Sequence, residues 1–242
     1  MRIIRSVAVW SIAVLLLAAC SEGSATGGGL LPVLPAGIDP TDDYPTCIVA
    51  DATFDDDVTI PEGVDCAFSN VTVEGNLAVA PNASLDLDGG LIDGNLLVYE
   101  GASVDVDGAT VKGNVQGERS AAVVVRGGSE VDGDVQVDRG QGAVRVLASD
   151  VLGNVQVEVT SGPIEVLDGF VDGDVQLKQN PGAIDVSRNT VAGNVQLEAN
   201  RGGVEVFDNV IDANLQCSGN TAPIEGGGNV VGGDKEGQCA AF

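Results

Sequence analysis

Apolar and polar residues alternate along most of this chain, and the alternation returns at a fixed interval. In the copy at residues 191–197, Val191, Val195 and Leu197 share one parity, and smaller or polar residues fill the other. A period of two, rich in β-branched residues, is typical of a β-strand. The glycine of this unit recurs every 19 and then every 20 residues, at 75, 94, 113, 133, 153, 173 and 193, is replaced by Ala213, and returns at Gly233.

A repeat of this length without a helical pattern is typical of a solenoid. A second apolar pair recurs in each copy, for example Ile164 with Val166, so each coil has at least two strands that stack in parallel on their equivalents. The crossover that joins equivalent parallel strands of neighbouring coils is expected to be right-handed. The sequence therefore predicts an all-β, right-handed parallel β-helix (solenoid) of about ten 19–20-residue coils. Val58 lies one period before Leu77, so the first coil is expected to begin near Asp55.

Stacked coils place equivalent apolar residues in interior columns. We expect three such columns: Leu77, Leu96, Val115, Val135, Val155, Val175, Val195, Leu215; Val73, Ile92, Val111, Val131, Val151, Val171, Val191, Ile211; and Leu85, Val104, Val123, Val144, Ile164, Ile184, Val204, Ile224. Small and amide residues recur at two further bends and tolerate positive φ. These bend residues are Gly142, Gly162, Gly182 and Gly202 at one, and Asn189, Asn209 and Asn229 at the other.

Two polar columns are interpreted as structural ladders. A glutamine column is expected to point outward, each amide bonding to those above and below: Gln116, Gln136, Gln156, Gln176, Gln196, Gln216. A bend column follows the repeat glycine: Asn76, Asn95, Asn114, Asp134, Asn154, Asp174, Asn194, Asn214, Asp234. No two aspartates are adjacent in it, as expected because stacked carboxylates repel.

The start of the chain has the pattern of a processed, exported protein. Residues 1–19 combine Arg2 and Arg5 with a short apolar run, which is typical of a signal peptide and too short to span a bilayer. The ending at Cys20 resembles the lipobox of bacterial lipoproteins, which implies a diacylated cysteine and stable membrane anchoring. Residues 20–46 are then a flexible Pro/Gly tether, and residues 47–242 are the solenoid. Because Ser21 is not an aspartate, the lipobox resemblance favours the outer membrane or the cell surface.

The other four cysteines lie at the two ends of the predicted solenoid. Cys47 and Cys66 are one coil apart, so their stacking distance suits a disulfide. Cys217 and Cys239 lie 22 residues apart at the other end. We predict one disulfide at each end, which would protect the terminal coils of an exported protein.

Charge excludes some functions and leaves others open. Removal of Arg2 and Arg5 leaves 9 basic and 36 acidic residues, a formal charge of −27, which excludes nucleic-acid binding and favours a cationic or cell-envelope partner. Without histidine or a catalytic motif, no enzyme is predicted and no cofactor is expected, except Ca²⁺ at one outward acidic column. That column is Glu165, Asp185, Glu205 and Glu225. Solvated side chains that splay apart are the alternative interpretation of it.

The repeat V-x-G-N-V-x-V, over about residues 70–216, resembles the bactofilin-type polymer-forming β-helices. The resemblance implies a β-helix and end-to-end assembly, whereas the lipobox and the terminal cysteines depart from that family and favour a monomer with closed ends. The predicted function is a non-catalytic, membrane-anchored cell-envelope scaffold. The alternatives are a divalent-cation-dependent adhesion or self-assembling module and a polysaccharide-active β-helix enzyme.

Overall fold

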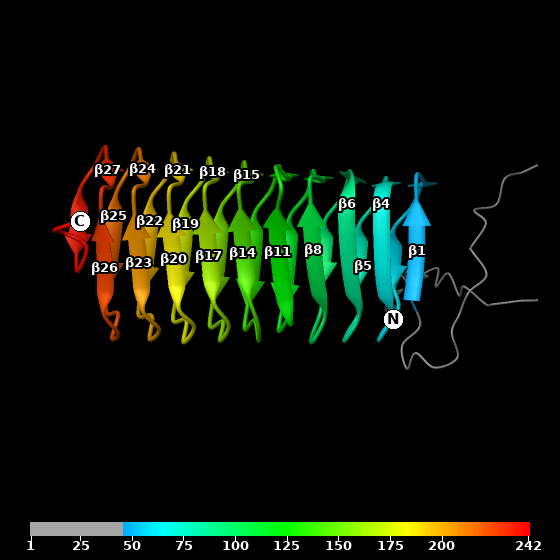
Figure 1. Cartoon of the computed structure of the whole chain (residues 1–242), viewed down its shortest axis with the longest axis horizontal. Coiled ribbons are helices and arrows are strands. Elements are labelled where there is room, and N and C mark those ends of the chain that lie inside the picture. Colours follow the sequence, from blue (N-terminus) through cyan, green and yellow to red (C-terminus); the bar gives the residue numbers. More distant parts are fainter. Residues whose placement is uncertain (1–45) are drawn as a thin grey trace, which may run out of the picture. The chain divides into compact units, whose positions relative to one another are not determined.

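A computed structural model describes residues 46–242 of the chain. These residues form a β-solenoid whose coils lie side by side in sequence order, from β1 to β28 (Figure 1). All strand pairs are parallel, and each joins residues 19 to 21 apart in the sequence, as between Val155 and Val175. The all-β solenoid of about ten coils predicted from the repeat is confirmed. In the described part of the chain, no helix is long and apolar enough to cross a membrane.

Each coil contributes to three parallel ladders of strands. The first ladder consists of β1 (Thr46–Ala50), β4 (Asp65–Val73), β6 (Ser84–Ile92), β8 (Ser103–Asp107), β11 (Ala122–Arg126), β14 (Val144–Leu147), β17 (Ile164–Leu167), β20 (Ile184–Ser187), β23 (Val204–Phe207) and β26 (Ile224–Gly227). The second consists of β2 (Thr53–Phe54), the ends of β4 and β6, β9 (Thr110–Val111), β12 (Glu130–Val131), β15 (Asp150–Val151), β18 (Phe170–Val171), β21 (Thr190–Val191), β24 (Val210–Ile211) and β27 (Val230–Val231). The third consists of β3 (Val58–Ile60), β5 (Leu77–Val79), β7 (Leu96–Val98), β10 (Val115–Glu118), β13 (Val135–Asp138), β16 (Val155–Glu158), β19 (Val175–Lys178), β22 (Val195–Glu198), β25 (Leu215–Ser218) and β28 (Lys235–Gly237).

The core is a continuous stack of aliphatic side chains inside the three ladders. The three predicted columns are confirmed: their members pair in register and are buried, apart from the partly buried Ile224 in the last coil. Alternation places every second residue of a strand inside, so valine, leucine and isoleucine fill the interior. Burial of these columns is the main favourable contribution to the fold.

The first coil begins earlier than predicted. Val58 pairs with Leu77 as expected, but β1 and β2 precede Asp55 and pair with β4. The period of 19 already relates Thr46 to Asp65, so the solenoid includes Thr46.

The bend residues that tolerate positive φ do not adopt it. Asn189 and Asn209 are not among the residues of positive φ, whereas the preceding Arg188 and Asp208 have φ values of 59° and 56°. The bend glycines from 142 to 202 also lack positive φ. Glycine is required at these positions because neighbouring coils approach closely. A Cβ on Gly202 would lie 2.3 Å or less from the backbone of Gly182. Glycine is needed there for space and not for backbone freedom.

The C-terminal residues fold back over the last coil. Cys239 is fully buried, and Phe242 packs against Gly226. Gln238 takes the place of a further coil: its Oε1 accepts a hydrogen bond from Asn220 N at 2.9 Å, and its Nε2 donates to Asn220 O at 2.9 Å. The Lys235 ammonium donates to backbone carbonyls, including that of Phe242. These contacts cover an end that would otherwise expose the core.

Candidate functional site

The bend column is a continuous hydrogen-bonded ladder, as predicted. In each step, the side-chain Oδ1 of one coil accepts from the backbone N of the next, as Asn76 Oδ1 does from Asn95 N at 2.9 Å. Asn95 Nδ2 donates to the same oxygen at 3.0 Å. The ladder starts at Asp57, whose carboxylate accepts from Asn76 N at 2.7 Å. Since an aspartate accepts but cannot donate, it suits this first position, and the ladder is structural.

The glutamine column is in register, but it is not a continuous ladder. Among residues 46–242, Gln116 Nε2 donates to Gln136 Oε1 and Gln136 Nε2 to Gln156 Oε1, each at 3.4 Å, and no other pair of glutamines in the column bonds. The expectation that every amide bonds above and below is therefore wrong. A nearby carboxylate competes with the next glutamine for the amide N–H: Gln176 Nε2 donates to Asp174 Oδ2 at 3.2 Å. These amides keep hydrogen-bonding capacity toward solvent.

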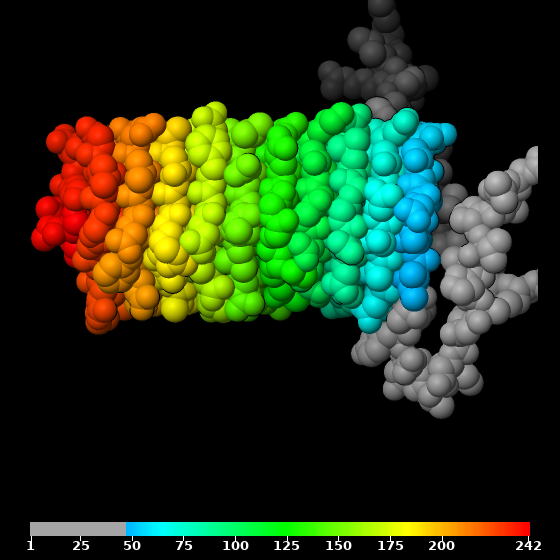
Figure 2. Space-filling view, turned by 45° about the horizontal axis from the view of Figure 1, so that its top comes forward, coloured from blue at the N-terminus to red at the C-terminus, as the bar shows by residue number. Residues whose placement is uncertain are grey.

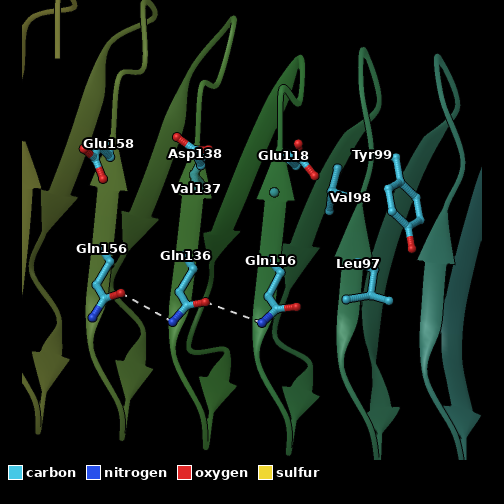
Figure 3. A pocket seen from close by; sticks show the side chains of 11 residues that line it. Leu97, Val98, Tyr99, Gln116, Glu118, Gln136, Val137, Asp138, Gln156 and Glu158 are labelled. Carbon is cyan, nitrogen blue, oxygen red and sulfur yellow. Dashed lines mark hydrogen bonds between the residues drawn. The ribbon is translucent and has the colours of Figure 1, made fainter. Parts of the chain in front are cut away.

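A groove lies over the part of this column where the glutamines do bond. We call it the amide groove; its volume is about 480 Å³ and it spans β7, β10, β13 and β16 (Figure 3). Its lining residues are Leu97, Val98, Tyr99, Gln116, Gly117, Glu118, Gln136, Val137, Asp138, Gln156 and Glu158. Two rows of outward side chains border it, and each row has one member per coil. The amide row is Leu97, Gln116, Gln136 and Gln156; the acid row is Tyr99, Glu118, Asp138 and Glu158.

The acid row is partly neutralised. Arg119 Nη1 lies 3.2 Å from Glu118 Oε1, and Arg139 Nη2 lies 2.8 Å from Asp138 Oδ2. Within the described residues, Glu158 has no ion pair. The groove therefore combines amides, one free carboxylate and the ring of Tyr99, which is 44% exposed. Such a surface can bind a polar ligand through hydrogen bonds.

The four predicted acidic residues do form one column. Glu165, Asp185, Glu205 and Glu225 are register partners on β17, β20, β23 and β26 and line a second groove of about 250 Å³. Arg145 Nε lies 2.8 Å from Glu165 Oε2. Its N–H is not directed at that oxygen, so we treat the contact as a charge pair rather than a hydrogen bond.

The remaining acids of the column differ in their contacts. Ser187 donates a hydrogen bond to Asp185, whereas Glu205 and Glu225 are exposed. No group of three or more acidic or cysteine side chains in the described part of the chain is arranged to hold a metal ion. The column is therefore present without a preformed coordination site.

Two buried asparagine ladders lie at the other bends, and sequence analysis missed their role. Asn180 Oδ1 accepts from Thr160 N at 2.8 Å, and Asn200 Oδ1 accepts from Asn180 N at 2.9 Å. Asn189, Asn209 and Asn229 form a second such ladder. Their 20-residue spacing was visible, but burial was the missing information. Because buried polar groups are costly without partners, these ladders are structural and not binding sites.

Both predicted disulfides are present. Cys47 bonds to Cys66 with a Cα–Cα distance of 4.5 Å, and Cys217 bonds to Cys239 with 5.3 Å. They lie in the first and the last coils, as predicted. The proposed lipidation site Cys20, the signal peptide at 1–19 and residues 20–45 of the tether lie outside the described residues.

Basic side chains on the surface pair with acids. Seven of the nine basic residues in the described chain form such ion pairs. The best-formed pair is bidentate: Arg188 Nε and Nη2 donate to the two oxygens of Asp168 at 2.6 and 2.8 Å. These hydrogen bonds hold the pKa of the Asp168 carboxyl below its ordinary value. Most acids among residues 46–242 are left without a cation, so this part of the surface stays strongly negative.

Comparison with models of protein families, with curated proteins and with solved structures finds no match to this chain.

Proposed function

We propose that this chain is a non-catalytic, lipid-anchored β-solenoid of the bacterial cell envelope that acts as a scaffold or interaction surface. The observation that carries the proposal is a uniform stack of coils with a disulfide at each end, preceded by a lipobox-like sequence at Cys20. Figure 2 supports a scaffold: successive coils form flush bands, and no long loop of residues 46–242 projects from the face it shows. β-Helix enzymes need such loops to build a cleft.

The disulfides favour export of the chain, which lipid anchoring at Cys20 requires. Disulfides form and persist in oxidising compartments outside the cytosol. A diacylated Cys20 would hold the chain at a lipid surface, and about 25 residues of tether would let the solenoid stand roughly 25–30 Å from it.

Lipidation is tested by metabolic labelling. The full chain is expressed in a bacterial host fed with an alkyne-tagged fatty acid, beside the variants Cys20→Ser and Cys239→Ser. We expect label and membrane association in the parent and in Cys239→Ser, and neither in Cys20→Ser. An unlabelled parent, or a labelled Cys20→Ser, would overturn the anchor.

A monomeric rod is the oligomeric form that the C-terminal end supports, because Gln238, Cys239 and Phe242 occupy the position of a further coil. End-to-end assembly, which the bactofilin resemblance implies, is the competing form. Light scattering after size-exclusion chromatography separates them: a single monomer peak supports the rod, and filaments in negative-stain images contradict it.

A cation-dependent adhesion module is the second candidate. The observation in its favour is that Asp185, Glu205 and Glu225 stack in register, and none has an ion pair within the described residues. Calorimetric titration with Ca²⁺ tests it against the double variant Asp185→Asn/Glu205→Gln. Heat and a raised melting temperature in the parent alone would support this candidate, and identical flat titrations would remove it.

A further inference from the structure

The amide groove has features that the three strand ladders do not require. Its two rows run across the strands, along the stacking direction of the coils, with one outward side chain per coil in each row (Figure 3). Tyr99 stands at one end, and its ring extends from the acid row toward Leu97 of the amide row. An exposed aromatic side chain is unusual on this surface: Tyr99 is one of six large apolar side chains exposed among the described residues.

We propose that the amide groove binds a straight, neutral polysaccharide chain that lies along the stacking direction of the coils. This proposal rests on the proposed function in one respect: the solenoid binds the polysaccharide and does not cleave it. It does not depend on lipidation of Cys20.

Geometry favours an extended chain with a short repeat. Coils stack at about 4.8 Å, so the rows present an amide and a carboxylate at that interval over three coils, and Leu97 and Tyr99 continue them on the fourth. Pyranose rings joined through equatorial bonds form a flat ribbon of comparable repeat, with hydroxyls along both edges. Such a ribbon can meet the amide row with one edge and the acid row with the other.

The amides are held in position for this role. Gln136 Nε2 donates to Asp134 Oδ2 at 2.9 Å and to Gln156 Oε1 at 3.4 Å, while its Oε1 accepts from Gln116. Each carboxamide has two N–H donors and an oxygen that accepts two bonds. Gln136 uses both donors and keeps one acceptor position for a sugar hydroxyl, whereas Gln116 and Gln156 keep N–H donors as well. A side chain that is already oriented loses less conformational entropy on binding.

Charge excludes an anionic chain, and the pairing of the acid row disfavours a polycation in the groove. The overall negative field repels anionic polymers. A polycation would compete with Arg119 and Arg139, which already pair with Glu118 and Asp138. Hydroxyls need no such exchange, because a paired carboxylate still has lone pairs that accept hydrogen bonds. Tyr99 offers an apolar face for a sugar ring and a hydroxyl for an edge contact.

Calorimetric titration of the full chain in mild detergent tests the proposal. The probes are cellohexaose and chitohexaose as neutral chains, hexagalacturonate as an anionic chain and spermine as a cation. We expect saturable heat with at least one neutral hexamer and none with hexagalacturonate. Spermine heat that saturates while both neutral hexamers give none would overturn the proposal in favour of a cation site, and heat from no probe would also overturn it.

Variants locate the site. Tyr99→Ala and Gln136→Ala are each expected to weaken binding about tenfold. Gln196→Ala is the matched control, because Gln196 belongs to the same glutamine column two coils beyond the groove. It should bind like the parent. An equal loss in Gln196→Ala, or unchanged binding in both groove variants, would place the sugar elsewhere and contradict the proposal.

The same samples separate this proposal from the proposed function. Unchanged far-UV circular dichroism establishes that each variant is folded. Shortened oligosaccharides, detected by chromatography after incubation with the parent, would contradict a non-catalytic scaffold and leave glycan binding intact. Absence of both binding and cleavage would remove the groove proposal and leave the anchored scaffold standing.

Discussion

The buried asparagine ladders are expected to be the most sensitive polar part of the solenoid, and Asn200→Ala tests this. Asn200 is fully buried. Its Oδ1 accepts from Asn180 N at 2.9 Å and Asn180 Nδ2 at 3.1 Å, and its Nδ2 donates to Leu177 O at 2.9 Å and Asn220 Oδ1 at 3.0 Å. Truncation removes all four hydrogen bonds and leaves the Asn180 N–H without its partner.

The magnitude follows from burial. An unsatisfied buried donor costs about 1–3 kcal/mol, and each of the other lost bonds contributes about 0.5–1.5 kcal/mol. We expect Asn200→Ala to lower the free energy of unfolding by about 4 kcal/mol. The control is Asn194→Ala in the same coil, where the amide makes three comparable hydrogen bonds but is only half-buried. Water can replace those bonds, so its cost should be about 1 kcal/mol.

Urea unfolding followed by circular dichroism measures both values. The slope with urea must be equal in parent and variants for the comparison to hold, since solenoid coils can unfold in parts. Equal destabilisation by the two variants would refute the argument that burial decides the cost. A loss below about 1 kcal/mol in Asn200→Ala would do the same.

The remaining predictions concern an end, a bend and a surface pair. Cys239→Ser, which opens the bond to Cys217, should lower the free energy of unfolding by about 3 kcal/mol in urea, and reductant should then change the variant less than the parent. Gly173→Ala places a Cβ 2.6 Å from the carbonyl oxygen of Gly153 in the preceding coil, so we expect the free energy of unfolding to fall by about 1–3 kcal/mol in the same assay. Stability equal to that of the parent would contradict close stacking of the coils. Arg188→Gln should lower the melting temperature at neutral pH only. The lowered pKa of Asp168 stabilises the fold above the ordinary aspartate pKa, about 3.9, and this contribution disappears as pH falls through the folded-state pKa. If the difference in melting temperature between the parent and Arg188→Gln persists unchanged at about pH 2, the Arg188–Asp168 ion pair is not its cause.

Much of the fold follows from the period of the sequence. A repeat of 19 or 20 residues with alternating valines dictates parallel stacking, so the register of Val155 with Val175 and the pairing of Cys47 with Cys66 were predictable. The bend ladder from Asn76 to Asp234 was predictable for the same reason, because a fixed period places equivalent residues one above another.

Only the tertiary structure decided how each column is used. Asn189 and Gln196 recur with the same spacing, yet the first is buried in a ladder and the second is half-exposed, without a glutamine partner. Periodicity states which residues stack, but burial and the direction of each side chain depend on where the chain bends. The amide groove has the same origin: Tyr99 and Gln156 belong to different coils, and packing of the coils brings them to one surface.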